Sequence, residues 1–141
     1  NWPPHGVRGV GYSRANLYGI NFKKYKDKKV KPLVIAIIES KKGFENLNEI
    51  LDVKNLDGIF IGPYDLSASY NILGKFNSKK FKLIIKNIKK LCALKKVPCG
   101  IHVVETDLKK LKYSMKNFQF VAYSIDAQLI SDGIRNMNKI L

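Results

Sequence analysis

Acidic residues and arginine are scarce in this chain of 141 residues, although its positive charge is high. Its 26 Lys and Arg residues outnumber 11 Asp and Glu residues, which gives a formal net charge of +15. Of the basic residues, 23 are Lys and only 3 are Arg. Recognition of bases and phosphates favours the arginine fork, and the lysines are spread over nearly every expected helix. We therefore expect no nucleic-acid partner.

Cysteine is also scarce. The two cysteines, Cys92 and Cys99, have neither the spacing of metal ligands nor the number needed for a disulfide framework. Cys92 falls on an apolar helix face and Cys99 at the start of a strand. Both are expected to be buried free thiols of a reducing compartment, which favours a cytoplasmic protein.

Long apolar runs and a signal peptide are absent from the printed sequence. No apolar stretch approaches the length that spans a bilayer, so we expect no membrane partner. The chain opens with Asn1 rather than Met, which suggests that an upstream part is missing. The length suits one modest domain with a core of its own.

A nucleotide-binding glycine loop is missing as well. Residues 6–11 contain three glycines, but they follow a Pro-Pro pair and precede no junction between a strand and a helix. A dinucleotide-binding fold is therefore disfavoured.

Four short apolar runs are present instead, and each is followed by a segment with helical periodicity. Near-continuous hydrophobicity is typical of parallel strands that are covered on both faces. Repeated strand–helix units predict a parallel α/β sheet with right-handed crossovers. Either an open doubly wound sheet or half of a (β/α)₈ barrel satisfies this pattern. The expected strands are residues 33–39, 58–62, 99–104 and 118–124.

The expected helices follow from apolar residues at three- and four-residue spacing. Thr106 or Asp107 is the expected cap of the helix after the third strand. Before the first strand, residues 2–19 are expected to form an ordered loop and residues 22–31 a solvated helical connector. The helical segments are residues 44–51, a short turn at 66–70, a long helix with its apolar face between Phe81 and Cys92, a helix with Leu108, Leu111 and Met115, and a last helix from Leu129 to Leu141.

Two of the expected strands end in a carboxylate. Glu39 ends the first, and Asp65 follows the second in the string Gly-Pro-Tyr-Asp-Leu-Ser at residues 62–67. One helical segment separates these strands, so both carboxylates should emerge side by side at the carboxyl end of a parallel sheet. Ligands gather at that end, and paired oxygen ligands suit Mg²⁺ or Mn²⁺. The alternative is that each carboxylate caps the helix that follows it.

The strings are specific enough to indicate a family. The chain resembles the C-terminal part of the HpcH/HpaI aldolases, the metal-dependent class II pyruvate aldolases that include 4-hydroxy-2-oxoheptanedioate and 2-dehydro-3-deoxyglucarate aldolases. The matching stretches cover almost the whole chain in the right order. They are residues 2–11, 13–15, 38–39, 46–51, 56–69 and 120–126.

This resemblance implies that residues 1–141 form a partial TIM barrel domain, the C-terminal half with about strands five to eight. It implies that Glu39 and Asp65 hold a divalent metal cation (Mg²⁺ or Mn²⁺, possibly Co²⁺). Tyr64 and Asp65 would bind the substrate through backbone amides. The implied reaction cleaves 2-keto-3-deoxy or 4-hydroxy-2-oxo acids to pyruvate and an aldehyde, through a metal-stabilised pyruvate enolate. The whole protein would be a homo-oligomer.

Some features depart from the family pattern. Many relatives carry a substrate-contacting Gln two residues before the glutamate, where this chain has Ile37. The catalytic histidine base and an enolate-stabilising arginine belong to the first half of the barrel, so this chain is expected to contribute no catalytic residue and to be inactive alone. An acyl-CoA lyase of the citrate lyase β-subunit type and a non-catalytic barrel remnant remain as alternatives.

The remaining polar residues near strand ends and loops receive structural roles. His5 is expected to be exposed, and His102 is expected to be satisfied by a neighbouring group rather than catalytic. Arg8 and Arg14 are expected to anchor their own glycine-rich loop. Glu105 and Asp126 also lie at strand ends, the latter as a cap or as support for the site.

Overall fold

The computed structural model describes residues 9, 11–27 and 32–138, in two compact units. The first unit spans Asn1–Pro32 and the second Leu33–Leu141. Within the first, a 3₁₀ helix, η1 (Arg14–Asn16), precedes α1 (Phe22–Asp27). The buried Asn16 side chain holds η1 together, because it accepts from the Ser13 amide and donates to the Gly11 carbonyl. Residues 2–8 and 10 of the expected loop and residues 28–31 of the expected connector lie outside the described residues.

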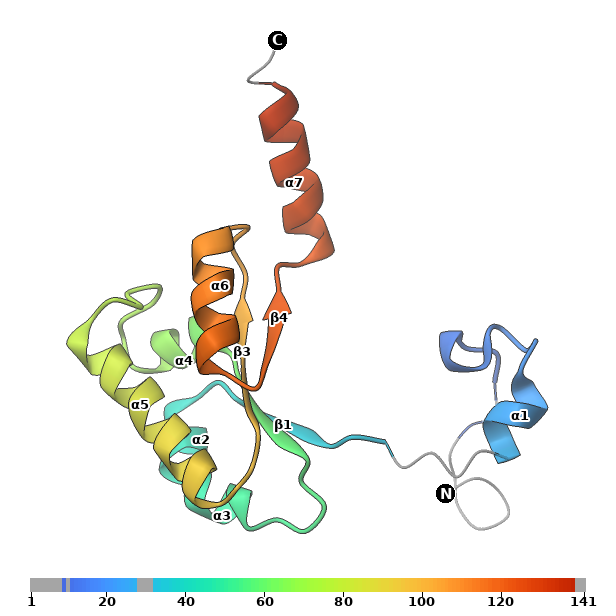
Figure 1. Ribbon diagram of the computed structural model, residues 1–141, viewed down its shortest axis with the longest axis horizontal. Coiled ribbons are helices and arrows are strands. Elements are labelled where there is room, and N and C mark those ends of the chain that lie inside the picture. The colour runs from blue at the N-terminus through green and yellow to red at the C-terminus, as the bar shows by residue number, and fades with distance from the viewer. Residues whose placement is uncertain (1–8, 10, 28–31, 139–141) are drawn as a thin grey trace. The chain divides into compact units, whose positions relative to one another are not determined.

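Four parallel strands form the sheet of the second unit in sequence order (Figure 1). They are β1 (Ile35–Ile38), β2 (Gly58–Ile61), β3 (Cys99–Val103) and β4 (Phe120–Tyr123). The register places Ile38 beside Ile61 and His102 beside Ala122. All four expected strands are therefore confirmed, each a residue or more shorter than its apolar run. The α/β class with a parallel sheet is confirmed as well.

Helices follow each strand, as the periodicity predicts. The expected helix at 44–51 is two short helices, because Asn46 leaves helical geometry between them. The turn expected at 66–70 is instead a helix that begins at Pro63, since proline at the first helical position carries no amide to leave unbonded. The helices are α2 (Lys41–Glu45), α3 (Leu47–Leu51), α4 (Pro63–Ser69), α5 (Lys79–Leu94), α6 (Leu108–Asn117) and α7 (Asp126–Met137).

The hydrophobic core lies between one face of the sheet and the helices α3, α4 and α5. Ile38, Ile59 and Ile61 from the strands are almost fully buried there. The apolar face of α5 fills the other side of this core, which confirms the predicted stripe between Phe81 and Cys92. Cys92 and Cys99 are both buried and free, as expected.

The opposite face of the sheet is only partly covered. The rings of Phe60 and Phe120 stack there, 6.0 Å apart, above the small residue Gly100. Ile37, in the same row on β1, is 56% exposed. In α6 and α7, several apolar side chains of the expected stripes are also exposed, including Leu108, Met115 and Ile130. No described helix is long and apolar enough to cross a membrane.

Candidate metal and oxo-acid site

The carboxyl ends of β1 and β2 bring Glu39 against Gly62. The Gly62 amide continues the ladder between these strands by donating to the carbonyl of Ile38, at 3.2 Å. The side chain of Glu39 leans over Gly62, so that a Cβ atom added there would lie 3.1 Å from the Glu39 Cβ and 3.6 Å from its Oε2. The absence of a side chain at Gly62 therefore leaves room for the Glu39 carboxylate at the start of α4.

Asp65 lies in the first turn of α4, three residues beyond Gly62. Its helix is anchored by buried neighbours, Pro63, Leu66 and Ser67. The Ser67 hydroxyl donates to the carbonyl of Tyr64 at 2.8 Å and accepts from the amide of Gly74 at 3.1 Å. The buried side chains and the bonds of Ser67 thus fix the start of the helix, while Asp65 itself is exposed to solvent.

Neither carboxylate caps a helix. Ser40 caps α2, because its hydroxyl accepts from the Gly43 amide at 3.0 Å. The cap residue of α4 is Gly62, and no side chain bonds to that end of the helix. Among the described residues, Glu39 and Asp65 form no hydrogen bond or ion pair. The capping alternative is therefore wrong.

The donor set suits a hard divalent cation. Carboxylate oxygens are the ligands that Mg²⁺ and Mn²⁺ prefer, and both side chains are exposed and unpaired within the described ranges. No group of three or more metal-ligating side chains occurs among the residues that the structure describes. Two carboxylates alone leave coordination positions for water and substrate, as a catalytic site requires.

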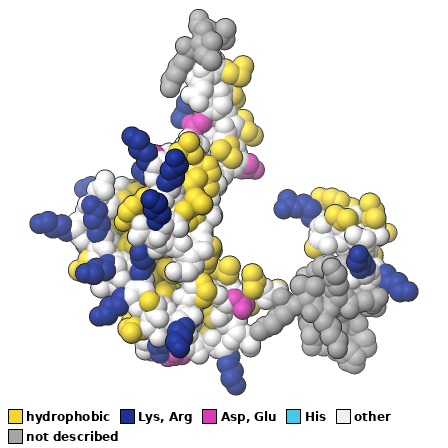
Figure 2. All heavy atoms as spheres, in the orientation of Figure 1, with side chains coloured by type: hydrophobic (Ala, Val, Ile, Leu, Met, Phe, Trp, Pro, Cys, Tyr) yellow, Lys and Arg dark blue, Asp and Glu magenta, His cyan; other side chains and the backbone are white. Residues whose placement is uncertain are grey.

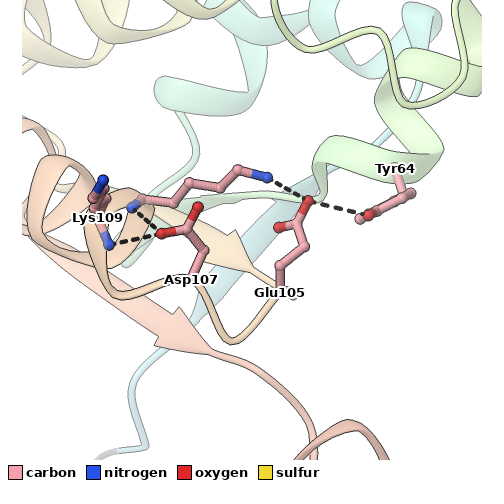
Figure 3. Close-up of polar contacts among 5 residues, drawn as sticks. Tyr64, Glu105, Asp107 and Lys109 are labelled. Carbon is pink, nitrogen blue, oxygen red and sulfur yellow. Dashed lines mark hydrogen bonds and ion pairs between the residues drawn. The ribbon is translucent and has the colours of Figure 1, made fainter. Parts of the chain in front are cut away.

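A polar cluster lies at the carboxyl ends of β2 and β3 (Figure 3). The Tyr64 hydroxyl donates to Glu105 Oε1 at 3.3 Å, and Lys110 Nζ donates to the same oxygen at 2.9 Å. Partial burial and the nearby Glu105 charge raise the pKa of Tyr64, which keeps the phenol protonated. Partial burial also works to raise the pKa of Glu105, but the bonds from Lys110 and Tyr64 hold it below its ordinary value.

This cluster directs the Tyr64 side chain toward β3. The ring of Phe76 packs edge-on against it, with centroids 5.0 Å apart. The phenol therefore bonds to Glu105, and only the backbone of Tyr64 remains at the start of α4.

Comparison with known proteins decides the family. The family model described as HpcH/HpaI aldolase/citrate lyase matches residues 2–132. This chain belongs to the HpcH/HpaI aldolase/citrate lyase family.

Two curated relatives from Escherichia coli are aldolases by name. The chain is 36% identical over 137 residues to 2-keto-3-deoxy-L-rhamnonate aldolase of Escherichia coli strain 536, covering 94% of this chain and 50% of that protein. The aldolase of the same name from strain K12 gives the same values. The chain thus spans about half the length of the curated relatives that it matches.

Solved structures of HpcH/HpaI proteins share the fold. An aldolase from Desulfitobacterium hafniense DCB-2 matches with a TM-score of 0.72 at 23% identity, over 99% of this chain and 54% of that one. A family protein from Burkholderia cenocepacia J2315 matches with a TM-score of 0.73 at 24% identity, over 96% and 53%.

Two other candidate residues of this HpcH/HpaI chain, His102 and Asp126, have structural partners. His102 Nε2 lies 3.1 Å from the carbonyl oxygen of Ser124, which confirms that a neighbour satisfies it. Asp126 begins α7, where its Oδ1 accepts from the Ala127 amide at 2.8 Å. Arg14 is exposed in η1. His5 and Arg8 lie outside the described residues.

Of the two expected caps, Asp107 is the one that caps α6. Its Oδ1 accepts from the amides of Lys109 and Lys110, at 2.7 and 3.2 Å. These bonds lower the pKa of Asp107. Thr106 instead donates to Asp132 of α7 at 2.5 Å.

Sequence reasoning did not pair Glu105 with Tyr64 and Lys110. A signal was available for one half of the cluster, since Glu105 precedes the Asp107 cap and a lysine follows in the first turn of the helix. The Tyr64 contact joins residues 41 positions apart, and it depends on the order of β2 and β3 in the sheet.

Proposed function

We propose that this chain carries the metal- and oxo-acid-binding half of a class II pyruvate aldolase. Such an enzyme would cleave 2-keto-3-deoxy or 4-hydroxy-2-oxo acids to pyruvate and an aldehyde. The observation that supports this is the position of the Glu39 carboxylate over Gly62, at the start of the helix that bears Asp65. The aldolase names of relatives at 36% identity support the reaction class.

In this proposal Glu39 and Asp65 hold Mg²⁺ or Mn²⁺, with Co²⁺ as a further possibility. The cation, when bound, supplies Lewis-acid stabilisation of negative charge on the oxo acid. The backbone amides of Tyr64 and Asp65 bind the substrate carboxylate. The Glu105 contact holds the Tyr64 phenol away from that position, so its bulk does not fill the site. Ile37 offers no hydrogen bond to the substrate.

The rest of the proposed enzyme is the other half of a (β/α)₈ barrel. The outer edges of β1 and β4 are unpaired within the described sheet, and the face with Ile37 and Phe60 is incompletely covered. A second set of four strands along these edges would close the barrel and bury that face. It would also bring the histidine base and the arginine that this half lacks, and the whole protein would assemble as a homo-oligomer.

An acyl-CoA lyase of the citrate lyase type is the second candidate, because the family description covers both activities. The two are separable by substrate: an aldolase releases pyruvate from an oxo acid, whereas the lyase requires a thioester. A barrel remnant without catalysis would cleave neither substrate.

Binding of Mn²⁺ tests the proposal. We expect the protein to bind Mn²⁺ in an electron paramagnetic resonance titration and to bind it more tightly with pyruvate present. Glu39→Gln and Asp65→Asn should each weaken this affinity by about tenfold or more, because each removes an anionic ligand. The exposed Glu49→Gln on α3 is the charge-matched control and should leave the affinity unchanged. Equal weakening by all three variants would contradict the assignment.

A further inference from the structure

A groove separates the outer helices α5 and α6, and its lining extends to Pro63 and Tyr64 at the start of α4. Its volume is about 1130 Å³, and its floor includes Ile101 of β3 and Phe118 after α6. At one end Lys89 of α5 bridges to Asn117 of α6 at 3.5 Å, with its ammonium 5.0 Å from the ring of Phe118. At the other end the Tyr64–Glu105–Lys110 cluster closes it.

Lysines line both sides of this groove. Figure 2 shows lysine side chains over α5 and α6, with hydrophobic side chains exposed among them. A single carboxylate, Glu105, lines the groove, and Lys110 already neutralises it. The lining lysines are Lys75, Lys82, Lys86, Lys89, Lys109 and Lys110.

Much of this charge is uncompensated. No carboxylate of the described residues forms an ion pair with Lys75, Lys82 or Lys86. Lys82, Lys86 and Lys89 recur at four- and three-residue spacing on α5, so they form a row about 10 Å long beside the groove. Like charges at this spacing repel one another, and an external anion would relieve that repulsion.

The lining also has an apolar part. Phe118 is buried and Ile85 is partly buried below the lysines, and Tyr113 on α6 is 67% exposed at the opposite side. An occupant that matches the groove therefore combines negative charges along its length with apolar side chains that reach the floor.

We propose that the groove between α5 and α6 is a docking site for an acidic segment of another protein, with Asp or Glu residues flanking apolar anchors. The lysine row favours an elongated polyanion over a single phosphate, which needs donors that converge on one point. Arginine is absent from the lining, which disfavours nucleic acid. This chain itself offers few anionic partners for these lysines, because its 26 Lys and Arg residues outnumber 11 Asp and Glu residues. This proposal does not depend on the aldolase activity.

A synthetic peptide tests this docking site. The probe is a fluorescein-labelled peptide that places Leu and Phe at helical spacing among Glu residues, and its binding to the protein is followed by fluorescence anisotropy. We expect saturable binding that weakens with added salt. A peptide with Gln in place of every Glu, and an all-Glu peptide without apolar residues, should each bind more weakly by about tenfold or more.

Two double variants assign the binding to the groove. Lys82→Glu with Lys86→Glu should reduce the affinity by about tenfold or more. Lys90→Glu with Lys112→Glu changes the net charge equally, at one position of α5 and one of α6 outside the groove, and should reduce the affinity less than about twofold. Tyr113→Ala, an exposed position that the fold does not need, should also weaken binding. Circular dichroism verifies that each variant is folded.

Several outcomes would overturn the proposal. Equal weakening by both double variants would mean general charge attraction without a site. If the Gln peptide bound as tightly as the Glu peptide, the lysines would not contribute to recognition. Tighter binding of a single-stranded oligonucleotide, lost in the Lys82 and Lys86 variant, would make the groove a nucleic-acid site. Absence of saturable peptide binding at low salt would also refute it.

Discussion

Single residues at the ends of strands carry the proposed function. The pairing of Glu39 with the start of α4 follows from residue types that the sequence displays, because a parallel sheet brings successive strand ends together. That neither carboxylate is a cap did not follow from the sequence. Ser40, next to Glu39, is as good a cap by type, and only the local backbone decides between them.

The pKa of Glu105 gives a pH-dependent prediction at this scale. Its bonds to Lys110 and Tyr64 hold that pKa below the ordinary glutamate value in the folded protein. The unfolded state therefore binds the proton more readily, and the contribution of Glu105 to stability is present above its unfolded pKa and lost as the pH falls through its folded pKa. Carbon-detected NMR titration of the Glu105 carboxyl should give a midpoint below that of glutamate in a short peptide.

A matched variant checks the cause of that shift. Lys110→Gln removes the ammonium from the Glu105 oxygen but leaves the Tyr64 bond available. The titration midpoint of Glu105 should then move upward. A midpoint that stays in place would contradict the assigned cause.

Gly100 gives a prediction about packing. A Cβ atom there would overlap the ring of Phe120, which stacks on Phe60. Gly100→Ala should therefore lower the free energy of unfolding, by about 1–3 kcal/mol, since the ring must shift in a packed row. Gly133→Ala on α7 meets nothing within 4 Å and should raise it by up to about 1 kcal/mol. Urea denaturation of both variants measures the difference, and equal effects would contradict this packing.

At the scale of elements, periodicity predicted which strands and helices exist better than it predicted where they begin and end. The four strands and the long helix α5 were predictable because fully apolar runs and a strong amphipathic stripe have few alternatives. The division of residues 44–51 into α2 and α3 was not, since it depends on the backbone of one residue, Asn46. The apolar stripes on α6 and α7 are exposed in the structure. An apolar pattern predicts a helix, but it does not predict which part of the protein covers that helix.

The start of α5 offers a test at this scale. The Ser78 hydroxyl accepts from the amide of Phe81 at 3.2 Å. Ser78→Ala should lower the free energy of unfolding by about 1 kcal/mol, because that amide loses its partner at the helix end. Asn77→Ala is the control, since Asn77 is exposed and precedes the cap. Urea denaturation measures both variants. A loss of stability in Asn77→Ala as large as that in Ser78→Ala would contradict the role of Ser78 as a cap.

At the scale of the whole molecule, the closed barrel is part of the proposed function. The family and the parallel sheet are established, and the chain matches about half the length of its relatives. Resemblance, rather than periodicity, pointed to half of a barrel, because four strand–helix units also suit an open sheet. An open sheet and half of a barrel can share this order of strands. The exposed Ile37 and the ring pair of Phe60 and Phe120 favour the half barrel, because they form an apolar face that further strands would bury.

The central claim is that Glu39 and Asp65 together hold a divalent cation whose remaining ligands come from an oxo acid. Anomalous diffraction from a crystal of the protein soaked in Mn²⁺ and pyruvate locates the cation most directly. We predict one strong manganese peak within bonding distance of both carboxylates, with pyruvate beside it. A peak elsewhere, or carboxylates turned away from each other with no manganese between them, would contradict the account.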